Sequence, residues 1–196
     1  MNLKRHTNPT QKENNMNEGT NFRQAGGFSF DFIRGEPSMY LAATDEGTIH
    51  RCSKSYAEQY LESYYGHDGS VYKVRSNPFW SDIFLTCSSD WTSKLWNWRE
   101  ENYKYSFKSL DLFDEVSDIE WNPNCSTLFA SVCKDGRLEL WDLAKNNMLD
   151  PFASDKPKEG AVSPKTMVRF CNGAPVLITG DMAGDTNIYR LHGELF

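Results

Sequence analysis

Hydrophobic and polar residues alternate in short runs along this chain, which is typical of β-strands with one face turned inward. In residues 116–121, Ile119 and Trp121 fall on one face, and Asp118 and Glu120 fall on the other. The run "TLFASV" that follows is almost continuously apolar, as expected for a strand covered on both faces. A Lys-Asp-Gly turn then leads into "RLELW", where the alternation resumes. The pattern therefore predicts short antiparallel strands joined by tight turns.

This pattern recurs at a fixed spacing. A shift of about 45 residues places residues 71–97 on residues 116–142 without a gap. The matched pairs include Val71 with Val116, Asp90 with Asp135, and Trp96 with Trp141. Weaker copies occupy residues 28–52 and 166–191. We therefore expect four repeats, with the approximate boundaries 22–65, 66–111, 112–160 and 161–196.

The repeats favour one architecture. A single small sheet cannot bury both of its faces, so neighbouring repeats must stack, and radial stacking gives a β-propeller. The period, Gly66-His67 and Trp141-Asp142 match the signature of WD repeats. We therefore expect an all-β WD-repeat β-propeller with about four blades. Four blades do not close a ring of the common seven-blade size, so we expect part of a larger propeller with exposed sheet faces on its end blades.

Resemblance to WD repeats also gives roles to particular polar residues. In such repeats a Gly-His histidine, an aspartate in a tight turn, a strand hydroxyl and a tryptophan form a buried hydrogen-bond network. The matching residues in the second repeat are His67, Asp90, Thr86 and Trp96. In the third repeat, Asp135 holds the position of the turn aspartate and Trp141 that of the tryptophan. A catalytic role for His67 and Asp90 is the competing interpretation, and the repeat context favours the structural one.

Two segments interrupt the repeats. Residues 1–21 contain almost no apolar side chains and many asparagines, which predicts a flexible polar tail ahead of a partial propeller spanning residues 22–196. Residues 144–166 contain three prolines and several charges, which predicts a longer loop between the last two blades.

Composition narrows the function classes. The 196 residues carry 21 Lys and Arg against 27 Asp and Glu, so the chain lacks the basic footprint of nucleic-acid binding or of unaided docking on acidic membranes. Five scattered cysteines without a Cys-x-x-Cys pair indicate reduced thiols rather than a disulfide framework. The chain has no Gly-rich phosphate loop with lysine and no histidine pair at metal-ligand spacing. We therefore expect no catalytic residue, metal or cofactor.

Several motifs outside the general repeat pattern resemble one family. The runs "EGTIHRCSKSY" and "CSSDWT", with the closing "VLITGDMAGDTNIYRL", resemble the C-terminal propeller of axonemal dynein intermediate chains, the outer-arm type in particular. Asn97 replaces the aspartate that usually follows the repeat tryptophan. We also expect the chain to be without the earlier blades and the long N-terminal segment by which that family binds light chains, so light-chain binding is not carried over.

The resemblance implies a non-catalytic subunit of a motor complex. Its propeller would hold the tail of a dynein heavy chain, assemble with another intermediate chain and other dynein subunits, and help to anchor the motor indirectly on the doublet microtubule. The implied location is the cytoplasm, the cytoskeleton and the axoneme of the cilium. A different class stays open, because "WNWR" at Trp96 to Arg99 approximates the Trp-Asp-x-Arg signature of WD-repeat substrate receptors of cullin ubiquitin ligases.

Three aromatic residues occupy predicted turns where smaller residues would suffice. Phe79 and Trp80 follow Asn77-Pro78 in the second repeat, and Trp91 occupies the turn position held by Gly136 in the third. Aromatic residues on exposed loops often dominate the binding energy of protein interfaces. We therefore expect Phe79, Trp80 and Trp91 to contact partner subunits, although packing on their own propeller is the alternative.

Overall fold

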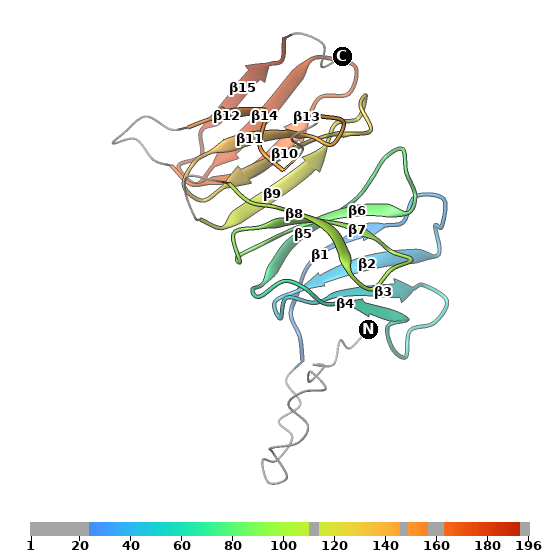
Figure 1. Cartoon of the computed structure of the whole chain (residues 1–196). Helices are drawn as coiled ribbons and strands as arrows, with labels where there is room; N and C mark the ends of the chain where they lie inside the picture. Colours follow the sequence, from blue (N-terminus) through green and yellow to red (C-terminus); the bar gives the residue numbers. More distant parts are fainter. Residues whose placement is uncertain (1–23, 110–113, 146–148, 157–162, 193–196) are drawn as a thin grey trace.

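Figure 1 shows the computed structural model of the chain, which describes residues 24–109, 114–145, 149–156 and 163–192. These residues form strands, turns and loops, and the strands are arranged in four antiparallel sheets. None of them forms a helix long and apolar enough to cross a membrane. The all-β fold predicted from the alternating pattern is confirmed.

Each sheet contains strands that follow one another along the chain. The first sheet contains β1 (Gly27–Phe32), β2 (Met39–Thr44), β3 (Ile49–Ser53) and β4 (Glu62–Tyr64). The second contains β5 (Val71–Ser76), β6 (Ile83–Ser88), β7 (Ser93–Asn97) and β8 (Tyr103–Phe107). The third contains β9 (Val116–Trp121), β10 (Leu128–Cys133), β11 (Leu138–Asp142) and β12 (Ala153–Asp155). The fourth contains β13 (Lys165–Phe170), β14 (Val176–Asp181) and β15 (Thr186–Arg190).

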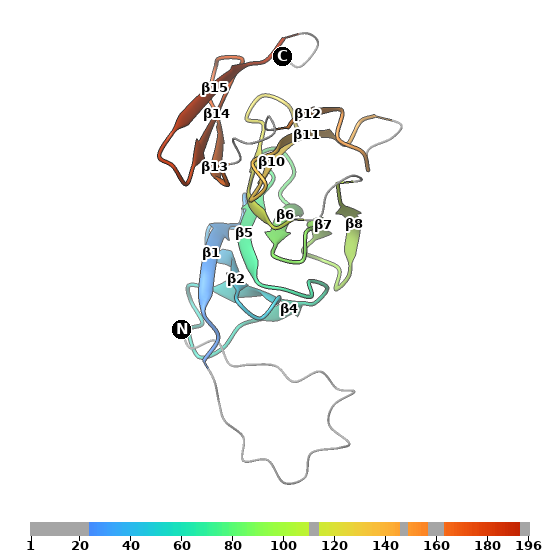
Figure 2. The ribbon, with the colours of Figure 1, turned by 90° about the vertical axis from the view of Figure 1, so that its left-hand side faces the viewer.

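The sheets stack as the blades of a propeller do. Figures 1 and 2 show them following one another in chain order along the molecule. Their first strands β1, β5, β9 and β13 are neighbours in that order. Each of these strands also has a β-bulge near its start, where one residue is skipped in the pairing with the next strand. The four sheets are therefore equivalent blades that share their register as well as their order.

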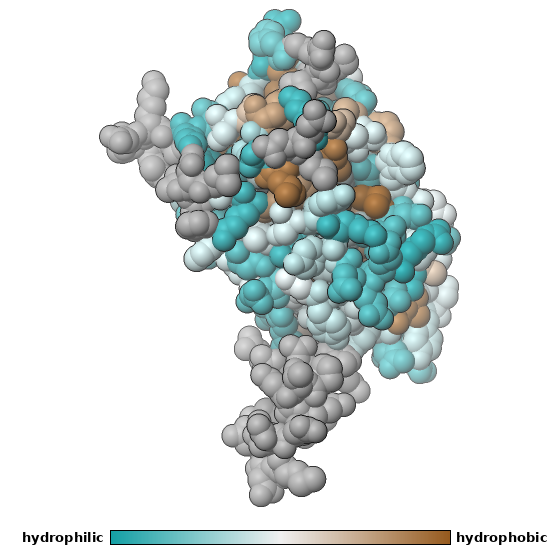
Figure 3. Space-filling view, viewed as in Figure 1, coloured by the Kyte–Doolittle hydropathy of each residue, from teal (hydrophilic) through white to brown (hydrophobic). Residues whose placement is uncertain are grey.

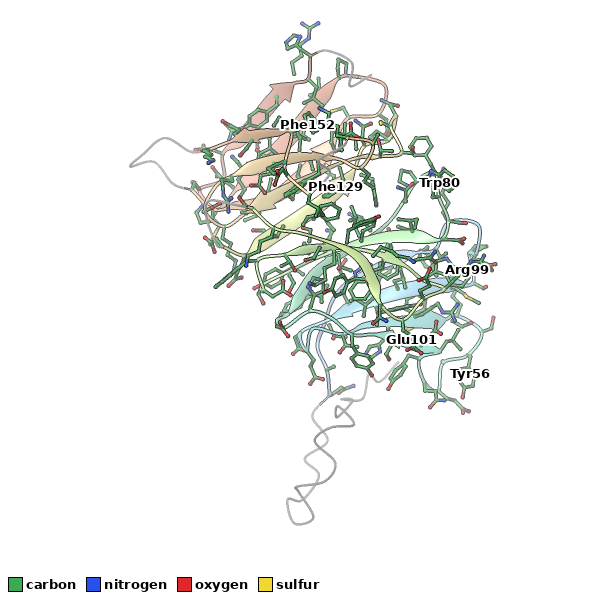
Figure 4. The ribbon with its side chains drawn as sticks, viewed as in Figure 1. Tyr56, Trp80, Arg99, Glu101, Phe129 and Phe152 are labelled. Atoms are coloured by element: carbon green, nitrogen blue, oxygen red, sulfur yellow. The ribbon has the colours of Figure 1, made fainter. Side chains whose placement is uncertain are left out.

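A separate hydrophobic cluster fills each boundary between neighbouring blades. The first boundary buries Leu41, Tyr64, Phe84 and Trp96, the second Phe107, Trp121, Phe129 and Trp141, and the third Ala130, Val132, Val168 and Leu177. At the second boundary, labelled by Phe129 in Figure 4, the rings of Phe129 and Trp141 stack with centroids 6.0 Å apart. Burial of this kind is the main stabilising contribution to such stacks, because no single blade has a core of its own.

Three of the five cysteines are core residues. Cys52, Cys87 and Cys133 are buried. Burial raises the pKa of the Cys87 and Cys133 thiols far above the usual value, which keeps both protonated at neutral pH.

The first blade exposes aromatic side chains on its first strand. Phe30 and Phe32 on β1 are 63% and 44% exposed. The matching residues of the third blade, Ile119 and Trp121, are buried against the second blade, where Trp121 Nε1 donates to the Arg75 carbonyl at 3.1 Å. The exposed face is therefore of the kind that packs on a neighbouring blade within the stack.

One predicted loop contains a strand. β12 lies within residues 144–166 and pairs with β11, with Leu138 opposite Asp155, so the longer loop predicted there is corrected: three of its residues form a strand. All three residues of β12 are exposed, and they give no alternating signal in the sequence. The predicted polar tail, residues 1–21, lies outside the described residues.

Candidate functional site

The second blade brings four of the predicted polar and aromatic side chains together. His67 lies in the loop before β5, Thr86 on β6, Asp90 in the β6–β7 turn and Trp96 on β7. His67 Nδ1 lies 2.8 Å from Asp90 Oδ2, and His67 Nε2 lies 2.7 Å from Thr86 Oγ1. Trp96 Nε1 donates to the same Thr86 oxygen at 2.8 Å. Loop, turn and two strands of one blade are thus joined by a continuous chain of hydrogen bonds.

One arrangement of protons satisfies the whole chain. Trp96 can only donate, so Thr86 accepts from it, and the Thr86 hydroxyl proton can then go to an unprotonated His67 Nε2. His67 then carries its proton on Nδ1 and donates it to Asp90. This arrangement makes His67 a neutral imidazole, in agreement with the lowering of its pKa by burial.

The carboxylate of Asp90 accepts hydrogen bonds on both oxygens. Oδ1 accepts from the Thr92 amide at 3.0 Å and the Thr92 hydroxyl at 2.6 Å, and Oδ2 also accepts from the Asp68 amide at 3.1 Å. Burial raises the pKa of the Asp90 carboxyl, but the hydrogen bonds from His67, Thr92 and Asp68 outweigh burial and hold it well below the usual range. Burial lowers the pKa of His67, and the contact with Asp90 reverses only part of this shift.

This cluster is closed to a substrate. The His67 side chain is 0% exposed and that of Asp90 is 10% exposed. A general base must come within hydrogen-bond reach of the group from which it takes a proton. The geometry therefore favours a structural role for the cluster over a catalytic one.

The third blade uses a different set of partners. Trp141 Nε1 donates to Ser131 Oγ at 2.8 Å, which repeats the bond of Trp96 to Thr86. Asp135 binds the amide and the side chain of Arg137 instead of a histidine. The position that corresponds to His67 is Leu112, which lies outside the described residues. Asp135 and Trp141 are thus not joined through an imidazole, in contrast to their counterparts in the second blade.

Arg137 and Glu139 were not identified from the sequence. Arg137 has a side chain that is 1% exposed, and its Nη1 lies 3.1 Å from Glu139 Oε1. The signal was present, because opposite charges two positions apart in a strand point to the same face. Arg137 immediately precedes β11, and Glu139 lies on β11 between the buried Leu138 and Leu140, so a buried ion pair is the consistent interpretation.

Metal ligation finds no support in the described part of the chain, where no group of three or more His, Cys, Asp or Glu side chains is placed to hold an ion.

The aromatic residues predicted as contacts lie at the two ends of β6. Phe79 and Trp80 are 51% and 65% exposed in the β5–β6 turn, and Figure 4 shows Trp80 on the side of the molecule that also carries Arg99. Both of their backbone amides donate to Asn77 Oδ1, at 2.8 and 3.0 Å. Trp91 is 45% exposed in the β6–β7 turn. The three residues therefore do not form one surface.

The arginine of the Trp-Asn-Trp-Arg motif is engaged within its own blade. Arg99 Nε lies 3.1 Å from Asp82 Oδ2, and the Arg99 guanidinium lies 4.6 Å from the centre of the Trp98 ring. Arg51 lies 4.9 Å from the same ring, so Trp98 contacts two cations.

Comparison with known proteins identifies the repeats. The family model described as "WD domain, G-beta repeat" matches residues 58–97 and 108–142. The expected WD-repeat propeller architecture is thereby confirmed as the fold class of the chain.

Relatives with curated names cover most of the chain. It is 39% identical over 195 residues to "Dynein axonemal intermediate chain 4" of Homo sapiens, an alignment that covers 97% of this chain and 22% of the relative. It is 34% identical over 179 residues to "Dynein intermediate chain 2, ciliary" of Heliocidaris crassispina (91% of this chain, 25% of the relative). It is 35% identical over 173 residues to "Dynein, 78 kDa intermediate chain, flagellar outer arm" of Chlamydomonas reinhardtii (87% and 25%).

The chain thus spans about a quarter or less of the length of these relatives. The resemblance noted in the "EGTIHRCSKSY" and "CSSDWT" runs is confirmed by the alignments. The chain belongs to the axonemal dynein intermediate chains, a family with WD repeats.

Proposed function

We propose that this protein is a non-catalytic scaffold subunit of an axonemal dynein motor complex. Its propeller binds the tail of a dynein heavy chain and helps to anchor the motor for ciliary movement. It assembles beside another intermediate chain and other dynein subunits, and reaches the doublet microtubule through them. Its location is the cytoplasm, the cytoskeleton and the axoneme of the cilium.

One observation carries this proposal beyond the names of the relatives. The histidine–aspartate cluster, the one arrangement in the described residues that resembles catalytic machinery, is sealed inside a blade, whereas large aromatic side chains are left exposed on turns. A rigid stack that buries its polar groups and exposes aromatic turns is suited to binding other proteins. Phe79, Trp80 and Trp91 are the contact residues that we propose.

The alternative of a cullin ligase receptor is not favoured. Its sequence basis is the motif ending at Arg99, and the Arg99 side chain already pairs with Asp82 and stacks on Trp98. The relatives described above are dynein intermediate chains.

The test is the composition of the native complex. The full-length protein, tagged at its natural locus in ciliated cells, is extracted from isolated axonemes, captured and analysed by mass spectrometry. We expect dynein heavy chains at amounts comparable to the tagged protein. Recovery of a cullin adaptor without a dynein heavy chain would contradict the proposal.

A further inference from the structure

An open hollow separates the turns of the first and second blades at the Trp80 end of the strands. Its volume is about 520 Å³, within the range of ligand-binding clefts. The β1–β2 turn contributes Arg34, the segment after β3 contributes Lys54, and the β5–β6 turn contributes Pro78. Asp31 and Phe32 at the end of β1 complete the part of the lining that carries charge or an aromatic ring.

The hollow carries an excess of positive charge. Among the described residues, neither Arg34 nor Lys54 forms an ion pair: Arg34 donates to the Pro78 carbonyl, and the Lys54 ammonium lies 4.7 Å from the centre of the Phe32 ring. The Asp31 carboxylate also lines the hollow and offsets part of this charge, but among the described residues it forms no ion pair with either cation. Its oxygens accept from the Ser76 amide at 2.8 Å and the Phe32 amide at 3.0 Å. A carboxylate brought by a partner would therefore meet two cations without an anionic partner of their own.

The aromatic turn beside this hollow is fixed before any partner arrives. Arg34 of the first blade binds the Pro78 carbonyl, and Trp98 Nε1 donates to the Ser81 carbonyl at 3.0 Å. Asn77 Nδ2 donates to the Ser126 carbonyl of the third blade at 3.0 Å. A side chain presented on a turn held from three sides loses little conformational entropy on binding.

The aromatic pair is not needed to build the turn. In the third blade, Asn122 Oδ1 accepts from the amides of Asn124 and Cys125, at 2.7 and 3.1 Å, which is the same closure without aromatic side chains. In Figure 3, hydrophilic side chains dominate the right-hand part of the first and second blades, so exposed aromatic side chains there lie in polar surroundings. Phe79 and Trp80 therefore add apolar area that the fold itself does not use.

From these observations we infer that the hollow and the aromatic turn form one docking site for an acidic and apolar segment of a partner protein. The ammonium of Lys54 and the guanidinium of Arg34 bind an Asp or Glu side chain of that segment through charge-assisted hydrogen bonds. Phe79 and Trp80 pack against an apolar side chain next to it. This inference rests on the proposed scaffold role and specifies the chemistry of the partner at one of its surfaces.

Lys54→Glu is the most direct test, because the Lys54 side chain contacts Phe32 and braces no turn. Full-length variants are produced in ciliated cells and captured. The measured quantity is the fraction of co-captured dynein heavy chain that stays bound through salt washes. We expect Lys54→Glu and Trp80→Ala each to lower retention by about tenfold or more. The matched controls, Arg190→Glu and Tyr56→Ala, change an exposed cation and an exposed aromatic residue away from the hollow and should retain wild-type binding. Normal binding by Lys54→Glu overturns the inference.

Site-specific cross-linking identifies the occupant. A photo-reactive amino acid at position 80 should cross-link to a partner segment that carries Asp or Glu beside an apolar residue. Replacing those acidic residues by Lys should then restore binding to Lys54→Glu. Cross-links confined to this chain, or to a segment without acidic residues, overturn the inference.

The two proposals fail separately. If the wild-type complex contains no dynein heavy chain, the scaffold role in a dynein fails, whereas the cross-link still reports the chemistry of the segment at position 80. If the dynein complex forms and none of the variants weakens it, the docking site fails and the scaffold role stands.

Discussion

Trp91 and Gly136 occupy the same position of corresponding turns and share a left-handed backbone, with φ of 70° and 84°. Gly47 and Gly184 hold that position in the other two blades, with φ of 80° and 91°. Glycine adopts such angles without a steric penalty, whereas a side chain with a Cβ costs about 1–2 kcal/mol there. The second blade thus keeps a half-exposed tryptophan where its fold would be served by glycine.

Comparing Trp91→Gly with Trp91→Ala isolates this strain. Both substitutions remove the indole ring, and only alanine keeps the Cβ that the left-handed backbone disfavours. We expect the glycine variant to be more stable than the alanine variant by about 1–2 kcal/mol, measured by thermal unfolding of the protein. If Trp91 is also a partner contact, both variants should lose the same amount of affinity for the partner, because both lack the indole ring. A loss of affinity caused by misfolding would instead be larger for the less stable alanine variant.

Ser89 in the same turn provides the control, since its φ is not positive. There Ser89→Gly should be no more stable than Ser89→Ala, because glycine loses more backbone entropy on folding. An alanine variant at position 91 as stable as the glycine variant would show that the turn relaxes without strain.

Substitution of Asp90 tests the hydrogen-bond cluster. Asp90→Ala removes the acceptor of the His67 imidazole and of the Thr92 amide and hydroxyl. Leaving such buried donors unpaired should lower the free energy of unfolding by about 1–3 kcal/mol. Partner binding should fall only under conditions where the variant unfolds. Unchanged melting together with abolished binding would instead make Asp90 an interface residue.

Titration of His67 should make the blade less stable in mild acid. Its pKa is lowered in the folded protein, so the unfolded chain takes up the proton first, near pH 6.5. The contribution of neutral His67 to the free energy of unfolding is fully present above that pH. It is lost progressively as the pH falls towards the pKa that His67 has in the folded protein. Asp90, whose pKa is depressed, contributes in the same direction only below about pH 4.

The measurement is the melting temperature between pH 7.5 and pH 5.5 for the wild type and His67→Gln. The variant should melt lower at pH 7.5 and show a smaller decrease on acidification, because glutamine does not titrate. If the melting temperatures of the two proteins fall in parallel with pH, His67 is not the cause of the acid sensitivity.

The repeat spacing in the sequence predicted the strands and turns that recur in every blade. It did not predict which polar residues pair when one blade carries a different residue from the next. Repetition of Trp96 at Trp141 placed the strands and turns correctly, because every blade must bury the same positions against its neighbour. The partners of the turn aspartate changed between blades, since Asp135 pairs with a buried Arg137 whereas Asp90 pairs with His67. The repeat spacing alone does not predict such a change of hydrogen-bond partner.

Surface features were predictable only in part. The exposure of Trp80 follows from its position in a turn, but the hollow beside it needs two blades to be placed against each other. Lys54 and Arg34 are 20 residues apart and belong to different turns, and nothing in the sequence pairs them. Cationic hollows between blades are a property of stacking and not of any one repeat.

The exposed aromatic face of the first blade gives the last prediction. When residues 24–192 are expressed alone, Phe30 and Phe32 should drive self-association, because exposed apolar patches of this kind are interaction surfaces. The double substitution Phe30→Ser and Phe32→Ser should lower the average oligomer size in light scattering and change the unfolding free energy by no more than about 0.5 kcal/mol per site. Trp121→Ser is the matched comparison, since Trp121 holds the position of Phe32 in the third blade and is only 3% exposed. Loss of this buried ring should cost about 3–5 kcal/mol and abolish cooperative unfolding. Equal effects of the two changes on folding would mean that Phe30 and Phe32 serve the core of their own blade and not an interface between blades.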